Sequence, residues 1–181
     1  MHPTRTRGSV RTCVLLAALL ASTPAVANDL AQRIKAAFLY NVAKFVDWPH
    51  NEGDFHLCIQ GAPEFAQTTR SELSGKQVRD RPLVIREQVA DVLDCAIVYL
   101  GHDLEDAAIV ATLRTLRGRP ILSVGEAPLL ISAGGILRLK QAQGKLRFEV
   151  ALAPVEESGL RISSKLLRLA EIVPHPTGPS P

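Results

Sequence analysis

The chain has 181 residues with a formal net charge of +3, and this small basic excess is confined to its first residues. Arg5, Arg7 and Arg11 precede residue 28 without any acidic residue, so the remaining 154 residues carry 18 basic and 18 acidic side chains. A formally neutral chain gives little support for a basic surface that binds nucleic acid, and a nucleic-acid partner is not expected. Its length suits one domain with a single core.

Residues 1–27 predict a secretory signal peptide. The early arginines form a positive region, residues 13–21 form an apolar run too short to span a bilayer, and Ala25-Val26-Ala27 matches a small-residue cleavage site. The alternative is a buried N-terminal helix. We therefore expect export, cleavage near Ala27 and a mature domain at 28–173.

The stretch from Ile34 to Asp47 predicts a helix that the rest of the fold covers. Its large apolar residues recur at the spacing of one helical face, at Ile34, Phe38, Val42 and Phe45. Pro49 should end the helix near Asp47. We expect a core element onto which a sheet packs, and an exposed groove for a partner is the alternative.

Two apolar runs, 55–61 and 95–101, predict buried parallel strands, and each contains one cysteine. Cys58 and Cys95 are the pair that remains after signal cleavage, and an even number in an exported protein favours a disulfide. Two buried free thiols are the alternative. A redox-catalytic pair is not expected because there is no Cys-x-x-Cys spacing.

Helices and strands alternate through the middle of the chain. The predicted elements are a helix at 63–74, an edge strand at 81–86, a helix at 104–116 and a strand at 120–124. The second helix is expected to bury Leu104, Ala108, Ala111 and Leu116. This rhythm predicts a mostly parallel sheet with right-handed crossovers and helices on both faces.

The pattern changes after residue 134. Residues 134–140 and 145–150 alternate apolar and charged side chains, which predicts a β-hairpin with one solvated face. A short strand at 159–163 and a helix at 165–173, capped by a serine at 163 or 164, should follow. Residues 174–181 predict a disordered Pro-rich tail. The fold class is therefore single-domain α/β, with a mostly parallel central sheet flanked by helices and an antiparallel C-terminal hairpin.

The sequence has no nucleophile elbow, phosphate loop or histidine pair, so no enzymatic activity, metal or cofactor is expected. His102 and Asp103 follow a strand, where α/β sheets bind ligands, although helix capping by Asp103 is the simpler interpretation. Glu156-Glu157 is interpreted as a solvated turn. A small-ligand module with its pocket near Gly61, Gly101 and His102 remains the alternative to a protein-binding function.

Several motifs together resemble the YfiR family of exported proteins. They are Ala36–Pro49, Leu57–Gly61, Leu73–Val78, Cys95–Leu100, Ile121–Val124, Gly134–Ile136, Leu146–Val150 and Gly159–Ala170. The resemblance runs from about Ile34 to Val173. It implies a periplasmic repressor that binds the periplasmic part of an inner-membrane diguanylate cyclase and lowers cyclic-di-GMP signalling.

The resemblance also implies that Cys58 and Cys95 are the family's disulfide pair, and that an outer-membrane YfiB-like lipoprotein is a second partner. A homodimer is an alternative assembly. The candidate docking surface is the exposed side of the hairpin, with Arg138, Lys140, Arg147 and Glu149. The alternative is that these charges only solvate one face of the sheet.

Overall fold

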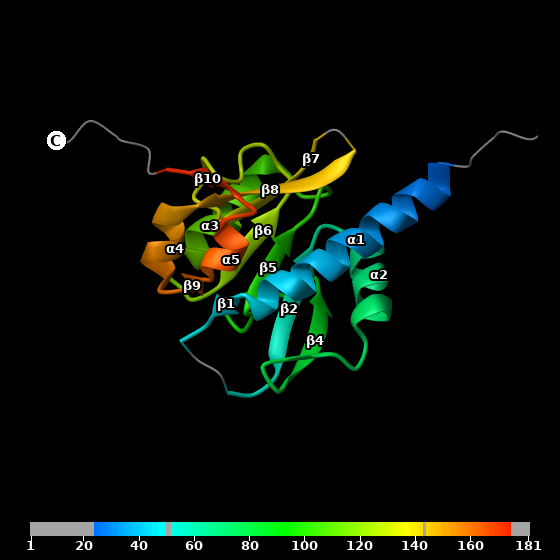
Figure 1. Cartoon of the computed structure of the whole chain (residues 1–181), viewed down its shortest axis with the longest axis horizontal. Coiled ribbons are helices and arrows are strands. Elements are labelled where there is room, and N and C mark those ends of the chain that lie inside the picture. Colours follow the sequence, from blue (N-terminus) through cyan, green and yellow to red (C-terminus); the bar gives the residue numbers. More distant parts are fainter. Residues whose placement is uncertain (1–23, 50–51, 143, 175–181) are drawn as a thin grey trace, which may run out of the picture.

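The computed structural model describes residues 24–49, 52–142 and 144–174 (Figure 1). It has the expected architecture, a mostly parallel central sheet with helices on both faces and an antiparallel hairpin near the end of the chain. The expected signal peptide lies outside the described residues except for positions 24–27, and the expected tail lies outside them except for Pro174.

Within the described residues, eight strands form one sheet in the order β10-β8-β7-β6-β5-β2-β4-β3. These strands are β2 (Phe55–Gln60), β3 (Gln77–Val78), β4 (Arg81–Glu87), β5 (Ile97–Leu100), β6 (Leu122–Gly125), β7 (Leu137–Ala142), β8 (Lys145–Ala151) and β10 (Glu171–Val173). Neighbours from β4 to β7 are parallel, and so are β8 and β10, whereas β7–β8 and β3–β4 are antiparallel. A separate antiparallel pair joins β1 (Val46–Asp47) to β9 (Arg161–Ile162).

The helices divide between the two faces of the sheet. They are α1 (Pro24–Lys44), α2 (Pro63–Leu73), α3 (Asp106–Leu116), α4 (Leu152–Ser158) and α5 (Ser164–Leu167). Side chains of α1, α2, α4 and α5 join the larger apolar cluster on one face, and Figure 1 shows α1 crossing in front of the strands. Helix α3 packs on the other face in a second cluster, which includes both cysteines.

The position of α1 in the core is as predicted, but the face that it buries is not. Val42 is buried as expected, together with Leu39, whereas Ile34 and Phe45 are 49% and 39% exposed. The buried stripe also contains Ala36 and Ala43, whose small side chains allow close packing. The helix ends at Lys44 rather than near Asp47, because Val46 and Asp47 pair with β9 instead.

Helix α3 also differs from the prediction in its buried face. It buries Ile109, Leu113 and Leu116, whereas Ala108 and Ala111 are exposed. Burial of branched aliphatic side chains removes more apolar area from water than burial of alanine, so the larger stripe turns to the sheet. The helix ends where expected, followed by Gly118 at φ +67°.

The predicted helix at 165–173 is wrong beyond its first turn. The Ser163 side chain accepts a hydrogen bond from the Lys165 backbone N–H, as capping predicts, but α5 ends at Leu167. Residues Glu171–Val173 instead form β10, because the open edge of β8 supplies backbone partners that a helix would leave unused.

Two smaller differences concern β4 and residues 152–158. The predicted edge strand, β4, is paired on its outer side with β3, but only at its first two residues. Residues Leu152–Ser158 form α4, which was not predicted, and Glu156-Glu157 lies in this helix rather than in a turn. Pro154 lies within the first turn of α4, where a missing N–H is tolerated.

Candidate functional site

The carboxyl ends of β2 and β5 are closely packed around the two glycines that the sequence singled out. A Cβ atom on Gly101 would lie 2.2 Å from the Gly61 carbonyl oxygen, and one on Gly61 would lie 2.4 Å from Cγ of Leu104. His102 is exposed, with Nε2 3.2 Å from Oδ1 of Asp103. The glycines thus permit a close backbone approach here, and ligand binding at this end stays a prediction.

Asp103 does not cap α3, contrary to the simpler interpretation of the sequence. The N-cap residue is Glu105, which makes no side-chain capping hydrogen bond. The helix starts three residues after Asp103, and the Asp103 backbone N–H donates to the Gly61 carbonyl, at 2.9 Å. This bond belongs to the contact between the ends of β2 and β5.

A polar cluster beside these strand ends ties α1 to the sheet. The Tyr99 hydroxyl donates to Oε1 of Glu126, and Nζ of Lys35 lies 2.8 Å from the same oxygen. Burial raises the pKa of Tyr99, and the Glu126 charge raises it further. Burial also acts to raise the pKa of Glu126, but hydrogen bonds from Lys35 and Tyr99 outweigh it and hold that pKa below its usual value. The cluster therefore favours an ionised carboxylate.

The hairpin of β7 and β8 contains the four charged residues of the predicted docking surface. Arg138 stands opposite Glu149 in register, and Lys140 stands opposite Arg147. Nε of Arg138 lies 2.7 Å from Glu149 Oε2, and Nζ of Lys140 lies 2.8 Å from Glu149 Oε1. Three of the four predicted residues are thus joined in one intramolecular network, and Glu149 is only 8% exposed.

The network extends to the edge strand. Lys140 Nζ also lies 2.6 Å from Oε2 of Glu171 on β10, and its bonds to Glu149 and Glu171 raise the pKa of Lys140. Burial acts to raise the pKa of Glu149, yet the hydrogen bonds and charges of Arg138 and Lys140 keep it below its usual value. These ion pairs connect β10 to the hairpin of β7 and β8 on its charged face.

Arg147 is the exception among the four residues. Its side chain is exposed, and within the described part of the chain it makes no hydrogen bond or ion pair. It lies directly across from Lys140, a like charge, and such a pair is unfavourable unless other charges compensate it. The two glutamates compensate Lys140 but leave Arg147 without a carboxylate.

The predicted cystine is present and joins two neighbouring strands. Cys58 on β2 is bonded to Cys95, just before β5, with the two Cα atoms 6.0 Å apart and 37 positions apart in sequence. Both residues are buried, at 0% and 4% exposure. The bond fixes the loop that contains α2, β3 and β4 to the centre of the sheet.

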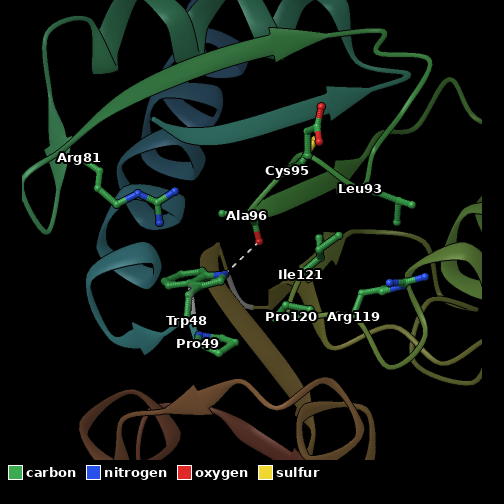
Figure 2. A pocket seen from close by; sticks show the side chains of 10 residues that line it. Trp48, Pro49, Arg81, Leu93, Cys95, Ala96, Arg119, Pro120 and Ile121 are labelled. Atoms are coloured by element: carbon green, nitrogen blue, oxygen red, sulfur yellow. Dashed lines mark hydrogen bonds between the residues drawn. The ribbon is translucent and has the colours of Figure 1, made fainter. Parts of the chain in front are cut away.

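A cavity of about 300 Å³ lies at the amino ends of β4, β5 and β6, opposite to the end that the sequence indicated. Its lining residues are Trp48, Pro49, Arg81, Leu93, Asp94, Cys95, Ala96, Arg119, Pro120 and Ile121. Figure 2 shows Trp48 and Arg81 on one side, with Leu93, Ile121 and Arg119 on the other. No sequence pattern predicts this site, because its residues come from four separate segments.

Across residues 24–49, 52–142 and 144–174, no group of three or more His, Cys, Asp or Glu side chains is placed to hold a metal ion. In the same ranges no helix has both the length and the apolar character needed to cross a membrane.

The sheet order and the cystine define a disulfide-bonded α/β domain. A model of the YfiR/HmsC-like family matches residues 32–171, and the chain belongs to this family. The family is periplasmic, is regulatory rather than catalytic, and acts in diguanylate cyclase signalling. The matched range contains the cystine, the hairpin and the cavity.

Proposed function

We propose that this protein is a periplasmic repressor that binds the periplasmic part of an inner-membrane diguanylate cyclase and lowers cyclic-di-GMP production. The observation that carries the proposal is the family match, which covers α2 to α5 and nearly reaches both ends of the described chain. The cystine supports it, because a bonded pair suits an oxidising exported compartment.

The exposed part of the hairpin is the proposed docking surface, with Arg147 as its central residue. Glu149 and Glu171 compensate the charges of Arg138 and Lys140 within the chain, so these residues position the surface rather than supply free charge. Arg147 retains its charge beside a like charge, and a carboxylate from a partner would relieve this repulsion. Its planar guanidinium group suits a two-point contact with such a carboxylate.

An outer-membrane YfiB-like lipoprotein is the proposed second partner. It would sequester the repressor and so release the cyclase. If both partners use the same surface of this protein, each must exclude the other. A mixture of the three proteins would then contain two different binary complexes and no ternary complex.

The test is reconstitution of the purified protein with membranes that contain the candidate cyclase. We expect the wild-type protein to bind the membranes and to lower the rate of cyclic-di-GMP synthesis. Arg147→Glu should weaken repression about tenfold, because it replaces an attraction at the interface by a repulsion. Arg114→Glu is the matched control, since Arg114 is an exposed arginine on α3, remote in sequence from the hairpin.

Two results would contradict the proposal at different levels. If the wild-type protein neither binds the membranes nor changes synthesis, repression of that cyclase is wrong. If it represses but Arg147→Glu and Arg114→Glu behave alike, the function stands and the docking surface lies elsewhere. Melting curves should show that both variants stay folded, since both side chains are exposed, and Arg147→Glu should be no less stable than wild type because it places an opposite charge across from Lys140.

A further inference from the structure

We propose that the cavity at the amino ends of β4, β5 and β6 binds a small organic anion with a flat apolar body. This inference does not depend on the identity of a cyclase partner. It concerns the concave site of Figure 2, whose residues no motif in the sequence brought together.

The walls of the cavity provide apolar surface in a fixed arrangement. The Trp48 ring is held by a hydrogen bond of 3.2 Å from Nε1 to the Ala96 carbonyl and by an edge contact with Phe55. Pro120 and Ile121 form the facing wall. Leu93 is 41% exposed at the mouth, although its backbone N–H is fixed by Asp91 at 2.8 Å. Because Trp48 and Ile121 are only 6% and 4% exposed, a flat apolar group bound here would remove mainly the Leu93 surface from water.

The charges at the cavity favour an anion. Arg81 donates from Nε to the Gly53 carbonyl and from a terminal nitrogen to the Asp54 carbonyl, each at 2.8 Å, so its guanidinium group is held in place. Arg119 lies at the opposite rim, and its exposed side chain makes no hydrogen bond or ion pair with the described residues. Asp94 is the acidic side chain among the lining residues, so the two arginines leave a net positive charge.

The size of the cavity selects a small molecule. A volume of about 300 Å³ lies at the lower end of the range for ligand pockets. The backbone at its base is already satisfied, since the Ala96 carbonyl accepts from both Trp48 and the Leu122 N–H. The ligand would therefore be recognised by its apolar body and by its charge, through Arg119, and not by backbone pairing.

The only tryptophan of the chain lines this cavity, so its fluorescence reports directly on occupancy. The probes are phenylacetate and its neutral isostere phenylacetamide, titrated into the purified protein, with free N-acetyltryptophanamide correcting for collisional quenching. Ligands of this size bind with dissociation constants of about 1–10 mM. We expect phenylacetate to bind about threefold to tenfold more tightly than phenylacetamide, the range of a partly exposed ion pair with directed hydrogen bonds.

Variants then separate charge recognition from general adsorption. Arg119→Gln should remove the preference for phenylacetate and leave phenylacetamide binding unchanged, whereas Arg114→Gln should change neither. Leu93→Asp should weaken phenylacetate binding more than phenylacetamide binding, because it adds a negative charge at the mouth. The absence of a Trp48 response at about 20 mM of either probe, equal affinities for both, or a preference that survives in Arg119→Gln would overturn the proposal.

Discussion

Opening the cystine is the perturbation whose cost follows most directly from the structure. Cys58 and Cys95 close a loop of 37 positions across the centre of the sheet. In the chain-entropy description, a loop of this length restricts the unfolded state by about 3.8 kcal/mol at 25 °C. Since small domains are stable by about 5–15 kcal/mol, reduction should remove a large part of the free energy of unfolding.

The assay is urea unfolding of the same protein with the disulfide intact and after reduction. A domain of this size has a denaturant slope of about 2 kcal/mol per molar urea, so the midpoint should fall by about 2 M. The reduced wild type keeps both sulfur atoms in the core, so this comparison isolates the covalent link. The double variant Cys58→Ala with Cys95→Ala should fall further, because it also leaves cavities at two buried positions.

A particular pattern of midpoints would refute the reasoning. If the oxidised and reduced proteins unfold within about 0.3 M of each other while the slopes agree, closure of the loop does not limit the unfolded chain. The contribution of the cystine would then be local packing, and the alanine variant alone would be destabilised.

Three further predictions concern buried polar groups. The folded-state pKa of Glu149 is lowered, so the ionised side chain stabilises the fold above the unfolded pKa of about 4.3, and this stabilisation is lost as the pH falls through the folded-state pKa. In urea unfolding, Glu149→Gln should therefore be less stable than wild type at pH 7, and it should lose less stability than wild type between pH 7 and pH 3. The Thr69 hydroxyl is buried without a hydrogen-bond partner among the described residues, so Thr69→Val should raise the free energy of unfolding by about 1 kcal/mol. An unchanged urea midpoint would contradict this prediction. Tyr99→Phe should lower the free energy of unfolding by about 1–2 kcal/mol. Its effect should not add to that of Lys35→Met in a double-mutant cycle, because both groups bond the same oxygen of Glu126; strict additivity would show that the two side chains are not coupled through Glu126.

The parts of the fold that the sequence predicted are those with a local pattern. Alternation of apolar and charged residues predicted the hairpin, and the structure pairs Arg138 with Glu149 across it. Continuous apolar runs predicted β2 and β5, and the cysteines of these two runs, Cys58 in β2 and Cys95 just before β5, are bonded. In each case the period of the side chains is set by the backbone geometry of a single element.

The candidate surfaces were predictable only in part. The sequence identified the charged residues of the hairpin, but it could not show that Glu149 is buried between Arg138 and Lys140 while Arg147 has no such partner. The pairing depends on the register and on Glu171 of β10, a strand that the sequence pattern assigned to a helix. The charge left for a partner is therefore a property of the assembled sheet.

The amino-acid sequence by itself determined the class of fold, the two central strands of the cysteine-containing apolar runs and the hairpin with one charged face, because local periodicity and turn residues specify these features. Tertiary structure decided which faces of α1 and α3 are buried, that residues 171–173 form an edge strand, and that Trp48, Arg81 and Arg119 surround one cavity. Those outcomes depend on contacts between segments distant in sequence, where the choice between alternative apolar faces and backbone partners is made by packing against the rest of the chain.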